Sequence, residues 1–256
     1  MNAAAVLGLG ALGIPVGSFL HVVIDRVPDK APLRGPREGE PCDPVSVAGV
    51  PLQPWLLRRG RGAGTPLPRR WLAVELTTAA VFGVFASRFG DDLRILPLLV
   101  LGASLVAVSV IDLQLLRIPD RVTFPTLAVA LPLVGLVSLR YDDGEAFIAA
   151  LIGAVAYFVL LFLPHLVYPR GMGFGDVKLA LVMGLYLGWL GWSEAHPLGG
   201  PFQLVLYGLM LGCMLGVVFG LISAAVTRRH GEFPFGPALA LACIVVTYYA
   251  PDLRLV

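Results

Sequence analysis

The sequence contains little charge. Asp, Glu, Lys and Arg make up 14% of its 256 residues, and 57% of the residues are apolar, whereas soluble domains have about 25% charged and about 45–50% apolar residues. The mean hydropathy is +0.82. The apolar residues gather in blocks long enough for a helix to cross a bilayer, which takes about 17–25 residues. The composition therefore excludes a soluble domain and predicts a membrane protein.

Cysteine is also scarce. The three cysteines, Cys42, Cys213 and Cys243, are far apart in the chain, so they provide neither a disulfide framework nor the spacing of a zinc site. The sequence therefore predicts no bound metal. The formal net charge is only +2, and the basic residues lie in loops between apolar blocks, so no nucleic-acid partner is expected.

The apolar blocks predict the fold. Lipid offers the backbone no hydrogen-bond partner, so each block must be helical, and we expect an all-α polytopic protein with about eight transmembrane helices in the lipid bilayer. A first helix over residues 1–24 would precede a small cytoplasmic loop domain over 25–70, rich in Pro, Gly and Arg, and a seven-helix domain over 71–256. The predicted spans are about 3–24, 71–89, 94–113, 122–139, 145–168, 177–192, 202–226 and 236–250.

The positions of Lys and Arg predict the orientation. Fifteen of the 19 lie in the segment after the first span and in the loops after the third, fifth and seventh, and four lie on the other side. Cytoplasmic loops collect Lys and Arg. The richer side is therefore predicted to face the cytoplasm, with both chain ends on the opposite side.

Only a few acidic residues, including Glu75, lie in or against the apolar blocks, where charged side chains are costly and are candidates for function. Asp112 lies seven residues before Pro119, which places it roughly 10 Å inside the end of the third span at about 1.5 Å per residue. Asp176 opens the sixth span. Both approach the membrane from the predicted cytoplasmic side. Two carboxylates at one site can activate water against a peptide carbonyl and polarise that carbonyl.

Each acid also has a structural interpretation. Asp112 could accept a hydrogen bond from a Ser or a backbone group in the bundle. Asp176 could cap the sixth span, because Asp is a favoured N-cap residue. The glycines Gly171, Gly173 and Gly175 favour an active-site loop over a plain cap, since three alternate glycines let another backbone approach closely.

Three further charged residues near the predicted cytoplasmic face are candidates for the site. Lys178 either extends its amine to the interface or pairs with Asp176 or with an acid of the substrate. Asp120 and Glu232 could bind basic residues of a substrate, and solvated loop charges are the alternative for both.

Four motifs of this chain resemble those of the type IV prepilin peptidases. Gly171–Leu179 resembles their second catalytic motif, of the G-x-G-D type, and Ile111–Asp120 resembles the first, an Asp six residues before I-P-[ND]. Gly17–Pro28 resembles G-S-F-L-N-V-x-I-x-R-x-P, and Phe233–Pro237 resembles I-P-F-G-P at the entry to the last span. The four motifs follow in order across nearly the whole chain, so the resemblance is specific.

The resemblance implies an intramembrane aspartyl endopeptidase of the bacterial cytoplasmic membrane. It implies that Asp112 and Asp176 are the catalytic pair and that 71–256 is the peptidase domain. The substrates would be prepilins or pseudopilins with short basic leaders, cut after a Gly on the cytoplasmic face. Cleavage itself would require no cofactor.

The chain departs from the family pattern in the cytoplasmic loop. Many members have two C-x-x-C pairs there, whose four thiolates could hold zinc. Here only Cys42 remains, and Val45 stands where its partner would fall. The family's second activity, N-methylation of the new pilin N-terminus with S-adenosylmethionine, is associated with this loop, so its retention stays open.

Two alternative functions are compatible with the same pair of acids. Presenilin-like and signal-peptide-peptidase-like proteases also use G-x-G-D, and Pro237–Leu239 spells their P-A-L signature. However, Ile111 stands where they have Tyr, and the N-terminal motif has no counterpart among them. A proton-coupled transporter could use the same two acids, but such folds often contain inverted repeats, and the sequence shows no repeat.

Overall fold

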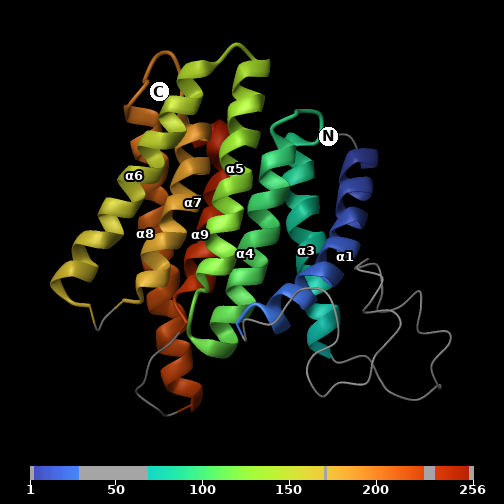
Figure 1. The fold of residues 1–256 in the computed structure, drawn as a ribbon, viewed down its shortest axis with the longest axis vertical. Coiled ribbons are helices and arrows are strands. Elements are labelled where there is room, and N and C mark those ends of the chain that lie inside the picture. Colours follow the sequence, from blue (N-terminus) through green and yellow to red (C-terminus); the bar gives the residue numbers. More distant parts are fainter. Residues whose placement is uncertain (1–2, 29–68, 170–171, 228–233, 254–256) are drawn as a thin grey trace. The chain divides into compact units, whose positions relative to one another are not determined.

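The computed structural model describes residues 3–28, 69–169, 172–227 and 234–253. Within these ranges, all the elements of regular secondary structure are α-helices (Figure 1). All eight helices there are long and apolar enough to cross a membrane, which confirms the predicted all-α polytopic fold. They are α1 (Ala3–Arg26), α3 (Arg69–Phe89), α4 (Ile95–Leu115), α5 (Asp120–Arg140), α6 (Gly144–Val167), α7 (Phe174–Gly191), α8 (Gly199–Thr227) and α9 (Gly236–Leu253).

Helices α5 and α7 begin earlier than the sequence predicted, and both beginnings matter for the site. Helix α5 begins at Asp120 after an extended Pro119 (φ −76°, ψ 133°). Helix α7 begins at Phe174 after an extended Gly173 (φ −65°, ψ 136°). An extended residue in front of a helix is the usual N-cap conformation. As a result, Asp120 and Asp176 both lie in the first turn of a helix.

The chain divides into two compact units, Met1–Asp91 and Asp92–Val256. The first unit contains α1 and α3, and the second contains α4 to α9. The predicted loop domain over 25–70 lies largely outside the described residues, so its proposed role stays a prediction.

In the first unit, α1 and α3 pack closely through small residues. A Cβ added at Gly13 would lie 2.5 Å from the Ala79 Cα, and one added at Gly17 would lie 2.7 Å from the Glu75 Cα. Membrane helices commonly use such small residues to bring their backbones together. The buried Ser18 hydroxyl also donates a hydrogen bond of 2.6 Å to the Glu75 carboxylate. This bond gives the one acid of α3 a partner within the unit.

In the second unit, α6 and α7 pack by the same principle. A Cβ added at Gly153 on α6 would lie 2.5 Å from the Gly184 carbonyl oxygen and 2.6 Å from the Gly188 Cα, both on α7. Since lipid gives little hydrophobic force between helices, this close backbone contact is a main source of their association.

Helices α4 and α7 are the most enclosed helices of this unit. Of their membrane-length stretches, 72% and 78% of the residues are buried, against 22% in α8. Helix α9 packs against both and is seen between them in Figure 1. The two helices that contain Asp112 and Asp176 therefore present these residues to the protein interior and not to lipid, as expected for functional acids in a membrane.

Candidate active site

Asp112 lies in the last turn of α4. The helix ends at Leu115, and the N–H of Leu116, a residue with φ 52°, donates a hydrogen bond to the Asp112 carbonyl oxygen. Asp112 is thus about 4.5 Å from the helix end, and the predicted depth of roughly 10 Å is wrong because the helix stops before Pro119. The side chain is nevertheless only 5% exposed.

The beginning of α9 faces the Asp112 carboxylate. The Gly236 backbone N–H donates a buried hydrogen bond of 2.9 Å to Oδ2 of Asp112. A Cβ added at Gly236 would lie 2.8 Å from the same oxygen, so glycine is needed for this approach. Helix N-termini present free N–H groups that favour anions. The sequence contained a signal for this contact, a Gly-Pro pair opening an apolar block, but its role was missed.

Asp176 is the third residue of α7, and Gly173 is the N-cap. The interpretation of Asp176 as the cap is therefore wrong. Its own backbone N–H donates a hydrogen bond of 3.1 Å to the Gly173 carbonyl oxygen. The side chain is 8% exposed, and its Oδ1 is buried with no hydrogen-bond partner among the described residues. A buried polar atom without a partner is unusual and needs a functional or structural explanation.

The structure brings Asp112 and Asp176 together. Helices α4 and α7 are in contact, and α9 packs on both. The Asp112 carboxylate lies close enough to Asp176 for a Coulombic interaction between the two side chains. Two neighbouring carboxyl groups could serve one substrate as an acid and a base.

The glycine segment before Asp176 packs on the connection after α4. A Cβ added at Gly175 would lie 2.8 Å from the Ile118 Cβ, so the absence of a side chain lets this connection approach α7. Met172 is held from α6, where Nδ1 of His165 lies 2.9 Å from the Met172 carbonyl oxygen. Gly173 is in place as the N-cap, whereas Gly171 lies outside the described residues.

Lys178 pairs with Asp120 and not with Asp176. The Lys178 Nζ donates hydrogen bonds of 2.7 and 2.8 Å to the two carboxylate oxygens of Asp120. Of the two predicted substrate-binding acids, Asp120 thus already has a partner within the protein. Glu232 lies outside the described residues, so its predicted role stays untested.

No group of three His, Cys, Asp or Glu side chains within the described ranges could hold a metal ion. Cys42 lies outside those ranges, so the expectation of a metal-free protein remains a prediction. The two acids need no metal to move a proton, because a carboxylic acid can donate one and a carboxylate can accept one.

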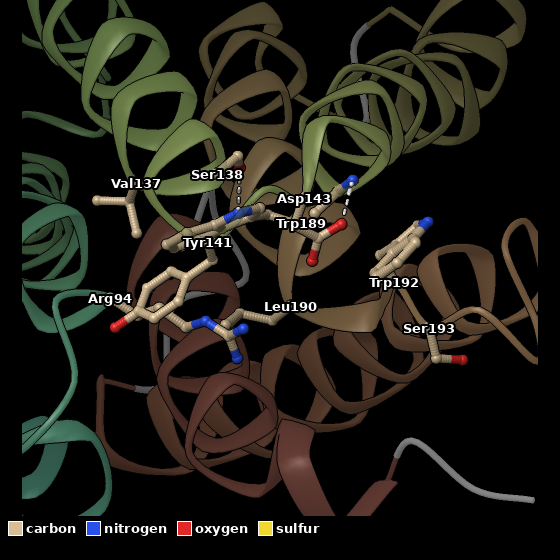
Figure 2. Close-up of a pocket in the computed structure, with 10 residues that line it drawn as sticks. Arg94, Val137, Ser138, Tyr141, Asp143, Trp189, Leu190, Trp192 and Ser193 are labelled. Carbon is tan, nitrogen blue, oxygen red and sulfur yellow. Dashed lines mark hydrogen bonds between the residues drawn. The ribbon is translucent and has the colours of Figure 1, made fainter.

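A second polar cluster lies at the opposite end of the same unit, where α4 begins and α5 ends. A cavity of about 140 Å³ is lined there by Arg94, Tyr141, Asp143, Trp189 and Trp192, among other residues (Figure 2). We call this region the Tyr141 end and the region around Asp112 and Asp176 the dyad end.

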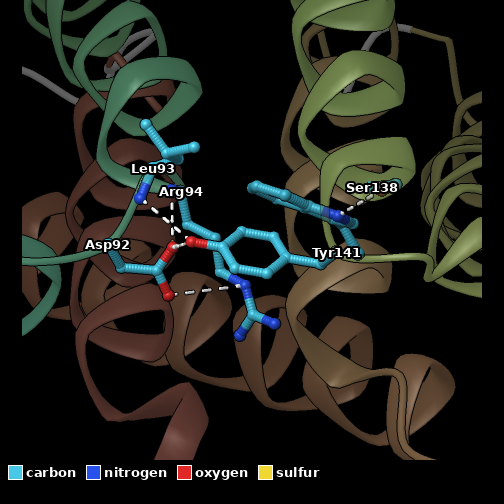
Figure 3. Close-up of polar contacts among 6 residues, drawn as sticks. Asp92, Leu93, Arg94, Ser138 and Tyr141 are labelled. Atoms are coloured by element: carbon cyan, nitrogen blue, oxygen red, sulfur yellow. Dashed lines mark hydrogen bonds and ion pairs between the residues drawn. The ribbon is translucent and has the colours of Figure 1, made fainter.

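Several polar groups of the Tyr141 end have partners within the protein. The Tyr141 hydroxyl donates a hydrogen bond of 2.8 Å to Asp92, whose carboxylate also lies 3.6 Å from Nε of Arg94 (Figure 3). Buried Trp189 donates a hydrogen bond of 2.9 Å from Nε1 to the Ser138 hydroxyl. Such satisfied groups stabilise helix ends.

Comparisons with known proteins identify the family to which the chain is similar. Residues 99–221 match the type IV leader peptidase family, and residues 11–89 match the bacterial peptidase A24 N-terminal domain. A prepilin leader peptidase/N-methyltransferase of Xanthomonas campestris pv. campestris is 30% identical, over 94% of this chain and 90% of the relative. Proteins with the same name from Aeromonas hydrophila and Bacillus subtilis are 33% and 27% identical, over 89% and 94% of this chain and 84% and 93% of the relatives. No solved structure matches the chain significantly.

Both Asp112 and Asp176 lie within the residues that match the leader peptidase family. The relatives match nearly the whole chain, which a chance similarity of apolar helices would not produce. The chain therefore belongs to the type IV leader peptidase family, as its four motifs predicted, and is a polytopic membrane enzyme with peptidase activity.

Proposed function

We propose that this protein is an aspartyl endopeptidase that removes the leader peptides of prepilins or pseudopilins, with Asp112 and Asp176 as its catalytic residues. The observation that most strongly supports this function is the buried, unpartnered Oδ1 of Asp176 beside a second buried carboxylate. The relatives named above are prepilin leader peptidases, which supports the substrate class.

The two acids divide the chemistry of peptide hydrolysis between them. One carboxylate takes a proton from water as the water oxygen attacks the scissile carbonyl, and the other, protonated, donates a hydrogen bond to the carbonyl oxygen. The tetrahedral intermediate then collapses as a proton passes to the leaving amine. The Gly236 N–H fixes one oxygen of Asp112, so its second oxygen keeps a defined direction toward the reaction.

The site is proposed to face the cytoplasm of a bacterial cell, in its inner membrane. Both acids lie at the helix ends that adjoin the Arg-rich loops, and such loops remain cytoplasmic. Short basic leaders also remain on that side, where they would meet the site.

Peptide cleavage by this pair needs no cofactor. The names of the relatives include an N-methyltransferase activity, which would use S-adenosylmethionine. The loop associated with that activity lies mostly in 29–68, outside the described residues, and we assign no methyl-transfer step to this chain.

The test is cleavage of a prepilin in membranes that contain the wild type, Asp112→Asn or Asp176→Asn. Asparagine has the size of aspartate but cannot exchange a proton, so each change should lower the rate at least about 100-fold, the range of general acid–base catalysis. Asp142→Asn is the matched control. Asp142 is exposed and has φ 53°, a conformation that Asn adopts readily, so this variant should cut like the wild type.

Two results would contradict the proposal. If the wild type cuts and either active-site variant cuts equally well, that acid is not catalytic. If the wild type cuts neither prepilins nor pseudopilins, the substrate class is wrong.

A further inference from the structure

The ion pair between Lys178 and Asp120 joins two helices close to the proposed catalytic acids. Asp120 is the first residue of α5, and Lys178 lies in the second turn of α7. The Lys178 amine reaches both oxygens of the Asp120 carboxylate, at 2.7 and 2.8 Å. A contact to both oxygens restricts the two side chains more than a single hydrogen bond does.

Two aromatic rings flank the same amine. The Lys178 Nζ lies 4.9 Å from the ring centroid of Phe174 and 5.8 Å from that of Phe124, within the range of cation–π attraction. Phe174 precedes Lys178 by one turn on α7, and Phe124 follows Asp120 by one turn on α5, so each ring is on the same helix face as its charged neighbour. Each helix thus contributes one ring and one charge.

The ion pair lies next to both acid-bearing segments. Lys178 is two residues from Asp176 on α7. Asp112 lies in the last turn of α4, and Asp120 follows the connection that leaves this helix. Ile118 of that connection packs against Gly175. The two chain segments that contain the acids are therefore in contact through Ile118 and joined again by Lys178 and Asp120.

We propose that Lys178 and Asp120 are positioning residues that fix the separation of the two carboxylates, and that Asp120 does not bind the substrate leader. This inference rests on the proposed function, because it assigns the pair to the reaction of Asp112 and Asp176. The physical reason is that the acids must be held in one geometry, since a displacement of about 1 Å can cost about 100-fold in rate.

A leader-binding role for Asp120 makes a different prediction. An acid that binds a basic leader should act mainly on KM, and only for leaders that have Lys or Arg. A positioning residue should instead lower kcat, because the misplaced acids lose transition-state stabilisation. The two roles also differ for Lys178, which a leader-binding Asp120 would not require.

The experiment compares kcat and KM for Lys178→Gln, Asp120→Asn and the double variant, using one prepilin with its basic leader and one with a neutral leader. We expect each single change to lower kcat about 10-fold or more with both leaders. Because both changes break one interaction, the double variant should be about as slow as the slower single variant. Lys178→Arg keeps the charge and should restore most of the rate.

Arg94→Gln is the matched control. Arg94 also pairs with an acid, Asp92, and lies 5.4 Å from the ring centroid of Tyr141, but at the opposite end of the unit. Its removal deletes an ion pair and a cation–π contact far from the acids and should leave kcat unchanged.

Thermal unfolding of the purified variants separates this inference from the proposed function. Non-additive losses for the single and double variants would show the coupling between Lys178 and Asp120 even if no prepilin were cut. In that case the substrate assignment would be wrong and the interhelical pair would stand. If the wild type cuts, the inference is overturned by an unchanged kcat in Lys178→Gln, or by an Asp120→Asn effect confined to KM with the basic leader.

Discussion

The two ends of the α4–α9 unit both bring polar side chains together, and they differ in whether those side chains are satisfied. At the Tyr141 end, Trp189 donates to Ser138, and Asp92 has partners on Tyr141 and Arg94. At the dyad end, Asp176 has a buried oxygen without a partner among the described residues.

This difference separates a structural cluster from a reactive one. A satisfied polar network rigidifies the helix ends, and its groups already have partners within the protein. An unsatisfied buried carboxylate costs stability and is tolerated where water or a substrate will bind. The cavity at the Tyr141 end is therefore a poor guide to the active site.

The largest difference between the two ends is expected when one glycine at each end is replaced by alanine. Gly236→Ala would place a Cβ 2.8 Å from the Asp112 carboxylate and should lower cleavage about 10- to 100-fold by displacing it. Gly144→Ala is the matched change at the Tyr141 end, where a Cβ would meet nothing within 4 Å, and should leave cleavage unchanged. Equal rates for the wild type and Gly236→Ala would show that the α9 contact does not position Asp112.

A smaller effect is expected when the Tyr141 end loses a buried partner. Ser138→Ala would leave the Trp189 N–H without an acceptor and should lower the free energy of unfolding by about 1–3 kcal/mol. Thermal or denaturant unfolding measures this loss. Cleavage at a temperature where the variant stays folded should equal that of the wild type. A large loss of activity with unchanged stability would instead assign a catalytic role to this end.

The smallest effect is expected from Tyr141→Phe. This change removes the exposed hydroxyl that donates to Asp92 and keeps the ring under Arg94. Exposed polar contacts contribute little, so the free energy of unfolding should change by less than about 1 kcal/mol. A loss well above that value would mean that the Tyr141 end holds the helices together more strongly than its exposure indicates.

Much of the site was predictable because it depends on local rules. An acid inside an apolar block is conspicuous at any position, so Asp112 and Asp176 could be identified without a structure. The structure of their neighbours was harder to predict. The N-cap of α7 is Gly173, whose backbone is extended. Residue preferences alone favour Asp as a cap, so they point to the wrong residue here.

The sequence by itself determined the eight helices and the two acids, because lipid forces each apolar block to be helical and makes every buried charge costly. Only the tertiary structure decided the partners. The Gly236 N–H meets Asp112 across 124 positions of the chain, and Lys178 meets Asp120 across 58. The physical reason is that such pairs depend on which helices lie side by side. That choice comes from close contacts such as Gly153 with Gly188, and small residues on one helix do not identify the helix that they will meet.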